Sequence, residues 1–255
     1  MSDSRLGIGA LYNPRVMKIK TSLLLTLAIL LCSSLAIAQE QKQAEPEHKL
    51  IQFQLALLKR GPKWTPNPGK DAPDLQKQHV NYVQSLMNSD KLMIAGRIQD
   101  DEDLKAIYIF RTASAEEAQN LINADPAVAG GYMVPELHPW WSEDVMKKVK
   151  ISNPTKLTTA YLAFLTRGEK WSAEKTAASA EIQKAHLANI QKLADMKKLV
   201  VAGPFGDNGT LRGIFVFKVA SLEEARSLAA TDPAVQAGRL ALQIHPWQVP
   251  EGILP

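Results

Sequence analysis

The sequence predicts an α+β protein in which one βαββαβ unit of about ninety residues occurs twice in tandem. Three observations predict this fold. Short sequences recur at a constant spacing of 107 residues, strand-like and helix-like patterns follow the same order around both sets, and a serine with a glutamate three residues later marks the same helix start in each copy. Together these features indicate an internal duplication.

The recurring sequences keep their order, and no gap is needed to align the two copies. They are Arg-Gly-x-Lys-Trp at 60–64 and 167–171, a histidine at His79 and His186, Ala-Gly at 95–96 and 202–203, Asp-Pro-Ala-Val at 125–128 and 232–235, and His-Pro-Trp at 138–140 and 245–247. A register that holds over separate motifs indicates duplication of a whole structural unit.

The first 38 residues have the organisation of a signal peptide. Residues 18–20 (Lys-Ile-Lys) are basic, residues 21–35 are apolar and rich in leucine, and residues 36–38 (Ala-Ile-Ala) form a small-x-small cleavage site. The apolar stretch is shorter than the ~20 residues of a spanning helix, so we expect cleavage, with an uncleaved membrane anchor as the alternative. Met17 is a candidate for the true first residue. We therefore expect a periplasmic or secreted protein.

The expected mature chain excludes several classes of function. Its only cysteine, Cys32, lies in the leader after a leucine, so we expect no lipidation, no disulfide bond and no catalytic thiol. Removal of the leader takes four basic and one acidic residue from totals of 30 and 26, which leaves a net charge of +1. No basic stripe is present, so we expect no nucleic-acid partner and, after cleavage, no membrane partner.

Each copy is expected to follow the order strand, helix, strand, strand, helix, strand, because two-residue and helical periodicities alternate in that way. In the first copy the elements are strand 51–59, a Pro-rich loop at 61–73, helix 74–89, strand 91–97, strand 106–111, a helix that begins at Ser114 and strand 131–137. In the second copy they are strand 159–166, helix 177–196, strand 198–204, strand 213–218, a helix that begins at Ser221 and strand 238–244.

Local signals indicate where several elements end. Glu117 and Glu224 lie three residues after Ser114 and Ser221 and predict capping boxes. The Asp-Pro dipeptides are expected to stop the second helix of each copy, and residues 207–209 (Asp-Asn-Gly) predict a hairpin turn. The expected limits are a polar tail at 39–48, a first repeat at 49–141, a lysine-rich linker at 142–157, a second repeat at 158–250 and a C-terminal tail at 251–255.

This order of elements is the split βαβ, or ferredoxin-like, unit, in which an antiparallel sheet carries both helices on one face. The other face of the sheet is apolar and needs a cover. Two fused copies can supply that cover for each other. We therefore expect two tandem ferredoxin-like units that pack sheet to sheet as an intrachain version of the dimeric α/β barrel. Whether the fused chain assembles further is left open.

The same topology brings sparse polar residues to one edge of each copy. The start of the first helix and the end of the second helix meet there, so His79 is expected beside Asp125, and His186 beside Asp232. The end of the first strand reaches that edge too. Its candidate binding residues are Arg60, Lys63 and Trp64 in the first copy and Arg167, Lys170 and Trp171 in the second.

The ordered motifs resemble the YCII-related domain over both repeats. They are a histidine in the first helix, then Lys-Leu-x-x-Ala-Gly-Pro, Ser-x-Glu-Glu-Ala, Asp-Pro-x-Val and His-Pro-Trp, and only the second copy keeps the proline, where the first has Arg97. That family is similar in fold to dimeric α/β barrels, and its members are proposed to use a His–Asp pair. By position, the resemblance implies His79 with Asp125 and His186 with Asp232. Tandem copies and export depart from the usual small cytosolic member.

A His–Asp pair suits acid–base chemistry on a small carbonyl compound or phenol, because the carboxylate fixes the imidazole tautomer and raises its basicity. Arginine can hold an anionic group and tryptophan can stack on a ring. The alternative is structural, since both histidines lie on apolar helical stripes and a bond to aspartate can join two helices. We expect tryptophan of His-Pro-Trp to pack against the other repeat.

These observations leave three hypotheses of different classes. The first is an isomerase-type or lyase-type enzyme for an anionic ring-like molecule, with His186 and Asp232 as the favoured pair. The second is a non-catalytic periplasmic binding module, and the third is a structural domain. The sequence has no Gly-rich phosphate loop and no metal-spaced His/Cys cluster, so we expect no cofactor and no metal. Related barrels bind haem in some families, but no residue here marks an axial ligand.

Overall fold

The computed structural model describes residues 49–65, 72–100, 103–145 and 156–255. The expected signal peptide and polar tail, part of the Pro-rich loop and most of the linker lie outside these residues. Residues 49–255 form one compact unit. Among the described residues, no helix has the length and apolar character needed to cross a membrane.

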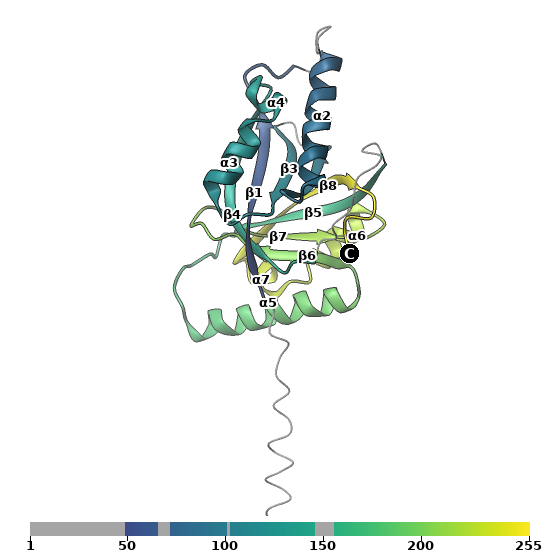
Figure 1. Cartoon of the computed structure of the whole chain (residues 1–255). Coiled ribbons are helices and arrows are strands. Elements are labelled where there is room, and N and C mark those ends of the chain that lie inside the picture. The colour runs from purple at the N-terminus through teal and green to yellow at the C-terminus, as the bar shows by residue number, and fades with distance from the viewer. Residues whose placement is uncertain (1–48, 66–71, 101–102, 146–155) are drawn as a thin grey trace, which may run out of the picture. The chain divides into compact units, whose positions relative to one another are not determined.

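Both repeats have the predicted βαββαβ order, and each second helix is divided in two. The first repeat contains β1 (Ile51–Arg60), α2 (Ala72–Asn88), β2 (Leu92–Ile98), β3 (Leu104–Phe110), α3 (Ala115–Asn123), α4 (Pro126–Ala129) and β4 (Met133–Ser142). The second contains β5 (Leu157–Arg167), α5 (Ala177–Asp195), β6 (Leu199–Pro204), β7 (Leu211–Phe217), α6 (Leu222–Ala229), α7 (Pro233–Gln236) and β8 (Leu240–Pro250). Figure 1 shows these elements.

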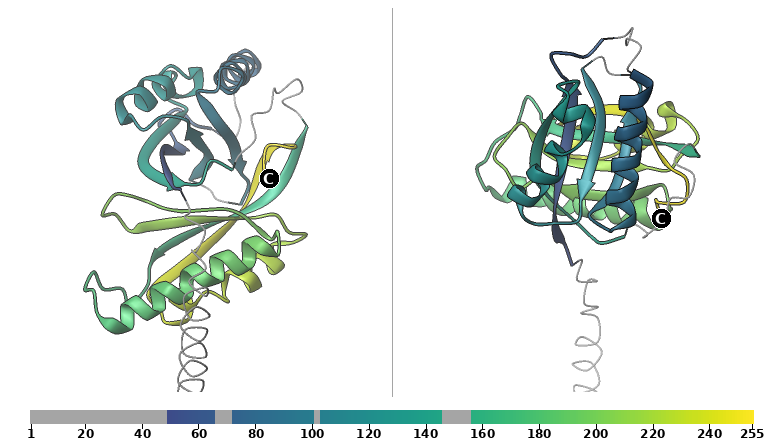
Figure 2. Two further views of the ribbon diagram at one scale, coloured as in Figure 1. Left: turned by 60° about the horizontal axis from the view of Figure 1, so that its bottom comes forward. Right: turned by 45° about the horizontal axis from the view of Figure 1, so that its top comes forward.

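The eight strands form one antiparallel sheet in the order β4-β1-β3-β2-β8-β5-β7-β6. Each repeat contributes four consecutive strands in the ferredoxin-like order, with its first and third strands in the centre. The two repeats therefore have the same internal topology. The helices of the two repeats lie on opposite outer sides, with the strands between them (Figure 2).

Two junctions join the repeats. At the first junction, β2 pairs with β8 through Arg97↔Gln248 and Ile98↔Trp247. At the second junction, an isolated bridge joins Trp140 of β4 to Phe205, directly after β6. Because the outermost strands of the sheet, β4 and β6, meet at the second junction, the sheet closes on itself. This closure confirms the predicted intrachain α/β barrel.

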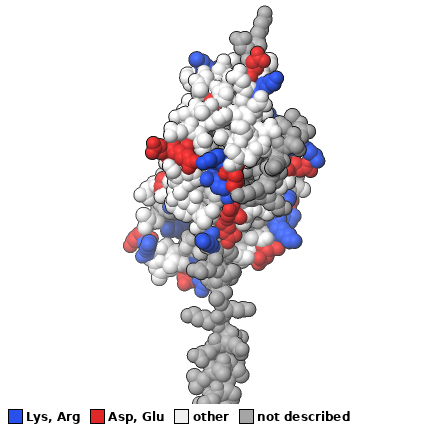
Figure 3. Space-filling model, in the orientation of Figure 1, with Lys and Arg blue, Asp and Glu red and all other residues white. Residues whose placement is uncertain are grey.

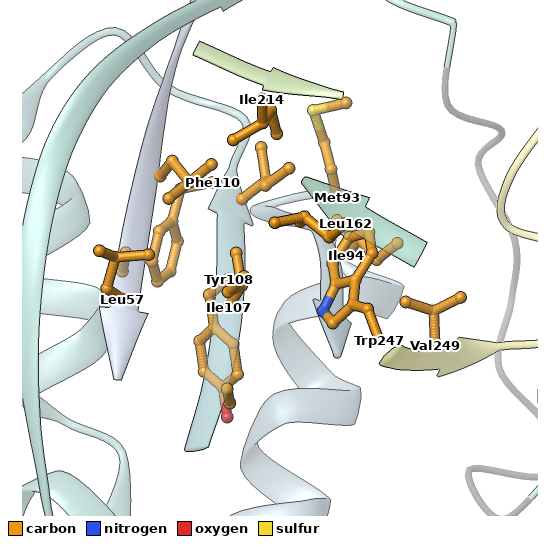
Figure 4. Close-up of a cluster of buried hydrophobic side chains, with 14 of the residues drawn as sticks. Leu57, Met93, Ile94, Ile107, Tyr108, Phe110, Leu162, Ile214, Trp247 and Val249 are labelled. Carbon is orange, nitrogen blue, oxygen red and sulfur yellow. The ribbon is translucent and has the colours of Figure 1, made fainter. Parts of the chain in front are cut away.

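The interior of the barrel is filled by apolar side chains from both repeats. Figure 4 shows Ile94 and Ile107 of the first repeat beside Leu162, Ile214 and Trp247 of the second. All five side chains are fully buried and belong to one hydrophobic cluster. This shared core explains why the apolar face of each sheet needs the other repeat, since burial of such side chains is the main favourable term in folding.

Glycine allows the repeats to approach closely at both junctions. A Cβ atom on Gly96 would collide with the indole nitrogen of Trp247, and one on Gly203 would collide with the backbone oxygen of Trp141. Trp140 then donates an Nε1–H hydrogen bond of 3.0 Å to the Gly203 oxygen. The repeated Ala-Gly pair is therefore a packing requirement, and the predicted contact of Trp140 and Trp247 with the other repeat is confirmed.

The final strands are longer than expected, and they contain the His-Pro-Trp motifs. β4 and β8 continue through Pro139 and Pro246 to Ser142 and Pro250, although proline lacks the N–H that a central strand needs. Proline is tolerated because β4 and β8 pair with β1 and β5 on one side, while on the other side the pairing with the other repeat begins only at Trp140 and Trp247. The prediction that these strands end at residues 137 and 244 is wrong for this reason.

Caps explain where the helices begin. Ser114 and Ser221 accept hydrogen bonds from the N–H groups of Glu117 and Glu224, as predicted for N-caps. The glutamates do not complete the capping boxes, because their carboxylates bind Lys91 and Lys198 instead. The Asp-Pro dipeptides follow the ends of α3 and α6, as expected, and they also begin the short helices α4 and α7.

Candidate functional site

In the first repeat, His79 of α2 binds Asp125 as the topology predicts. The distance between His79 Nδ1 and Asp125 Oδ1 is 2.7 Å. Asp125 is also the N-cap of α4, and its carboxylate accepts a hydrogen bond of 2.9 Å from the Ala127 N–H. His79 and the Ala127 N–H therefore both bind a carboxylate that is almost completely buried, while 16% of the His79 side chain remains exposed.

The second repeat has the same arrangement. His186 of α5 lies 2.7 Å from Asp232, measured from Nδ1 to Oδ2, and Asp232 caps α7 through the N–H groups of Ala234 and Val235. Asp232 is fully buried, and 13% of the His186 side chain is exposed. Since a carboxylate only accepts hydrogen bonds, Nδ1 carries the proton in this contact and the Nε2 lone pair is left available.

The two repeats differ on the other side of the imidazole. Tyr108 of β3 places its hydroxyl 3.5 Å from both His79 Nε2 and Asp125 Oδ2. The equivalent residue on β7 is Phe215, whose ring stacks on His186 with the ring centroids 6.0 Å apart. In the described part of the chain, His186 Nε2 therefore has no hydrogen-bond partner.

The Tyr108 hydroxyl is in an environment that opposes its ionisation. Burial raises the pKa of Tyr108 well above its ordinary value of 10.0, and the neighbouring Asp125 carboxylate raises it further by charge repulsion and by accepting its hydrogen bond. Tyr108 is therefore a neutral donor near the first dyad over the physiological range. The second repeat has only an apolar ring there.

The predicted binding residues after β1 and β5 form aromatic and cationic clusters. Arg60 lies over Trp64, with its guanidinium carbon 3.9 Å from the ring centroid. Arg167 lies 5.7 Å from the Trp171 ring. Lys63 and Lys170 contribute differently, because their backbone N–H groups bind the oxygens of Gly131 and Gly238 and their side-chain stems lie along these glycines.

Two further His–Asp pairs join the repeats, and sequence reasoning missed both. His138 Nδ1 lies 2.6 Å from Asp207 Oδ2, and His245 Nδ1 lies 2.9 Å from Asp100 Oδ1. In each pair the histidine belongs to His-Pro-Trp and the aspartate follows the second strand of the other repeat. Asp100 and Asp207 are also 107 residues apart, and this shared spacing is the sequence signal that could have indicated the two pairs.

At the second junction, the surroundings of Asp207 favour its ionised carboxylate. Burial opposes ionisation of Asp207, but hydrogen bonds from His138 and from the Gly209 N–H, with the charges of His138 and Arg212, lower its pKa below the ordinary 3.8. His138 Nε2 also lies 3.0 Å from Glu136. Despite these groups, no cluster suited to holding a metal ion exists within the described residues.

Two hollows in the surface have linings that include neither His79 nor His186. One of about 410 Å³ lies between α2 and α3 and includes Tyr82 and Ala124 in its lining. Another of about 530 Å³ lies beside β8 and is lined in part by Asp100, Arg226 and His245. Each imidazole is nevertheless partly exposed, with 16% of the His79 side chain and 13% of the His186 side chain accessible.

Solved structures confirm the fold. An arginine-to-lysine variant of chlorite dismutase from Candidatus Nitrospira defluvii matches with a TM-score of 0.53 at 11% identity, over 79% of this chain and 92% of that one. The same enzyme in complex with imidazole matches with a TM-score of 0.51 at 11% identity, over 80% and 91% of the two chains. At this identity the likeness shows the fold alone.

Sequence comparisons identify the repeats. The uncharacterized protein YjpA of Bacillus subtilis (strain 168) is 33% identical over 89 residues, which are 35% of this chain and 94% of that protein. One YjpA chain thus corresponds in length to one repeat. The model of the YCII-related domain matches residues 62–141 and again residues 161–248. The chain therefore belongs to the YCII-related domain family and contains two copies of that domain in tandem.

Proposed function

We propose that the protein carries out acid–base chemistry on a small anionic or aromatic molecule, with the His186–Asp232 dyad of the second repeat as the reactive pair. The observation that supports this proposal most directly is the asymmetry of His186. Its Nδ1 binds a buried carboxylate, while its Nε2 has no partner among the described residues and 13% of the side chain is exposed. An imidazole held in this way presents a lone pair to a ligand.

In the proposed reaction, His186 Nε2 takes a proton from a carbon next to a carbonyl or phenol group of the substrate. The electron pair of the broken C–H bond moves into the conjugated system of the substrate. Asp232 stabilises the imidazolium by accepting the Nδ1–H bond, and His186 then returns the proton. Return at a different carbon gives an isomer. In an elimination the electron pair instead expels a leaving anion, and His186 gives the proton to that anion or to water.

The first repeat is the weaker candidate for this chemistry. Its His79 Nε2 faces the Tyr108 hydroxyl at 3.5 Å, so a ligand would compete with an internal donor. The second repeat has Phe215 there and imposes no such competition. We therefore assign the reaction to the second repeat and a supporting role to the first.

A structural role for the dyads is the competing proposal. It is favoured by one specific observation, the N-cap position of both aspartates at the start of α4 and α7. In that role the His–Asp bond joins two helices and no substrate is turned over. A ligand that binds without chemical change would indicate the intermediate case, a binding module.

Proton exchange separates these roles. We would first select small organic acids and phenols that raise the melting temperature, then incubate each with the protein in D₂O and follow its C–H signals by ¹H NMR. The proposal expects exchange or conversion that falls by about 10²–10⁴ in His186→Ala and persists in the matched variant His79→Ala. Ligands that bind without proton exchange would indicate a binding module. Equal exchange rates in His186→Ala and His79→Ala would overturn the assignment of the chemistry to the second repeat.

We also propose that the protein is exported. The support is the basic, apolar and small-x-small order of residues 18–38, which the structure does not describe. Mass spectrometry of the protein from cell fractions tests this proposal. A chain that begins at Gln39 in the periplasm or medium is expected, and an intact leader in the cytosolic fraction would contradict it.

A further inference from the structure

Three arginines of the second repeat surround one tryptophan. The guanidinium carbons of Arg167, Arg212 and Arg239 lie 5.7, 4.8 and 5.6 Å from the centroid of Trp171. They come from the end of β5, the start of β7 and the residue before β8. Segments far apart in the sequence therefore bring three positive charges to one aromatic ring.

These arginines are held in place by backbone oxygens. Arg167 Nη2 donates to the Asn208 oxygen at 2.6 Å, Arg212 Nη1 to the Asp207 oxygen at 3.2 Å, and Arg239 Nη2 to the Ser172 oxygen at 2.7 Å. Each guanidinium has five N–H groups and uses one of them in these bonds. Most of the donors therefore remain for another partner.

No carboxylate of the described chain forms an ion pair with any of the three. The charge of Arg212 contributes to the lowered pKa of Asp207, but that carboxylate hydrogen-bonds His138. On the face shown in Figure 3, acidic and basic side chains are interspersed. Like charges in proximity repel one another, and a bound anion removes that cost.

Comparison with the first repeat shows which of the three cations is particular to the second repeat. Its equivalent cluster has Arg60 and Lys105 beside Trp64, and Tyr132 stands where the second repeat has Arg239. The backbone is the same in both places, since Gly61 and Gly168 bind the oxygens of Tyr132 and Arg239 at 2.9 Å. The fold therefore accepts tyrosine at this position, and the third cation is particular to the second repeat.

We propose that Arg167, Arg212 and Arg239 form a binding site for the carboxylate or phosphate group of a small molecule, positioned beside Trp171. Arginine suits this role because its planar guanidinium can give two parallel hydrogen bonds to such a group. Arg239 follows α7, the helix that Asp232 caps, by three residues, and in this proposal the site anchors an anionic substrate of the second repeat. The evidence for this anion site comes from the three arginines and Trp171, so the site does not require turnover at His186.

Titration calorimetry of the whole protein at low ionic strength tests this site with benzoate, phenyl phosphate and inorganic phosphate. We expect saturable binding, with phenyl phosphate above inorganic phosphate if the ring contacts Trp171. Arg239→Tyr should weaken binding by about tenfold, or about 1.4 kcal/mol, without lowering the melting temperature. Arg226→Gln is the matched control, because it removes one arginine on α6 and installs the residue of the first repeat.

The outcomes separate this site from the proposed chemistry. Saturable binding that Arg239→Tyr weakens and that His186→Ala leaves intact supports the anion site, whether or not exchange is seen at the dyad. Absence of saturable heat with all three probes, or equal weakening by Arg239→Tyr and Arg226→Gln, overturns it. If Arg239→Tyr proves unstable, Arg212→Lys, the residue of the first repeat, repeats the test with the charge retained and the paired hydrogen bonds lost.

Discussion

Asp232 has two structural tasks, and two substitutions separate them. It caps α7 and it accepts the Nδ1–H bond of His186. Replacement by alanine removes both interactions. The cap contributes about 1 kcal/mol, and a buried hydrogen bond to a charged group contributes about 1.5–3 kcal/mol. We therefore expect Asp232→Ala to lower the free energy of unfolding by roughly 2.5–4 kcal/mol.

Asparagine retains the cap, since it is as good an N-cap as aspartate, and its amide oxygen can still accept the Nδ1–H bond. A neutral bond is about half as strong as a charged one, so Asp232→Asn should cost roughly 1 kcal/mol. Urea denaturation followed by circular dichroism measures both values. Asp125→Ala and Asp125→Asn, in the first repeat, are the matched controls. The alanine variant should again cost more than the asparagine variant, although Asp125 has an additional contact with Tyr108.

A cost below about 1 kcal/mol for Asp232→Ala would refute this reasoning, because neither task would then carry the expected energy. Equal costs for both variants would show that the charge, and not the cap, dominates. The same variants inform function. Asp232→Asn should remain folded yet lose the acid–base activity proposed for His186, since the amide no longer stabilises the imidazolium.

Three more predictions concern the barrel and its titrating groups. Tyr108→Phe copies Phe215 and should flatten the fall in stability above pH 10, measured by denaturation. The reason is that the raised folded-state pKa of Tyr108 gives stability that is present below pH 10 and lost as pH rises. An unchanged alkaline profile would contradict this prediction. Gly203→Ala should destabilise the protein by roughly 1–3 kcal/mol, since the added Cβ atom would collide with the backbone oxygen of Trp141. Unchanged thermal melts would contradict the closed second junction. Asp207→Asn should make the stability of the protein less sensitive to acid below about pH 4, because the lowered pKa of Asp207 gives stability that is lost as pH falls. Identical acid unfolding of the wild type and the variant would count against the cross-repeat pair.

The fold and the dyads were predictable because both depend on topology within one repeat. Once the strand order is known, the start of α2 and the end of α3 must meet, and His79 must approach Asp125. The constant 107-residue spacing then places His186 beside Asp232. The long helices, the N-cap serines and the contact of Trp140 with the other repeat follow from local signals and from the need to cover an apolar sheet.

The remaining site features depend on contacts that no local pattern reveals. The pair of His138 with Asp207 crosses between repeats, and only the shared spacing of Asp100 and Asp207 indicates it. The cations at positions 212 and 239 escaped detection because the first repeat has lysine and tyrosine there, so comparison of the copies hides them. The contrast between Tyr108 and Phe215 mattered only once both rings were seen to face a dyad.

The tautomer of His186 tests the central claim most directly. Long-range ¹H–¹⁵N correlation NMR distinguishes protonated from unprotonated imidazole nitrogens, and His186→Ala assigns the signals among five histidines. The account predicts a proton on Nδ1 and a free lone pair on Nε2 in the neutral ring, with an Nε2 shift that responds to a bound ligand. An Nε2 that carries a proton throughout the pH range of the folded protein would contradict it, because no base would then face the substrate.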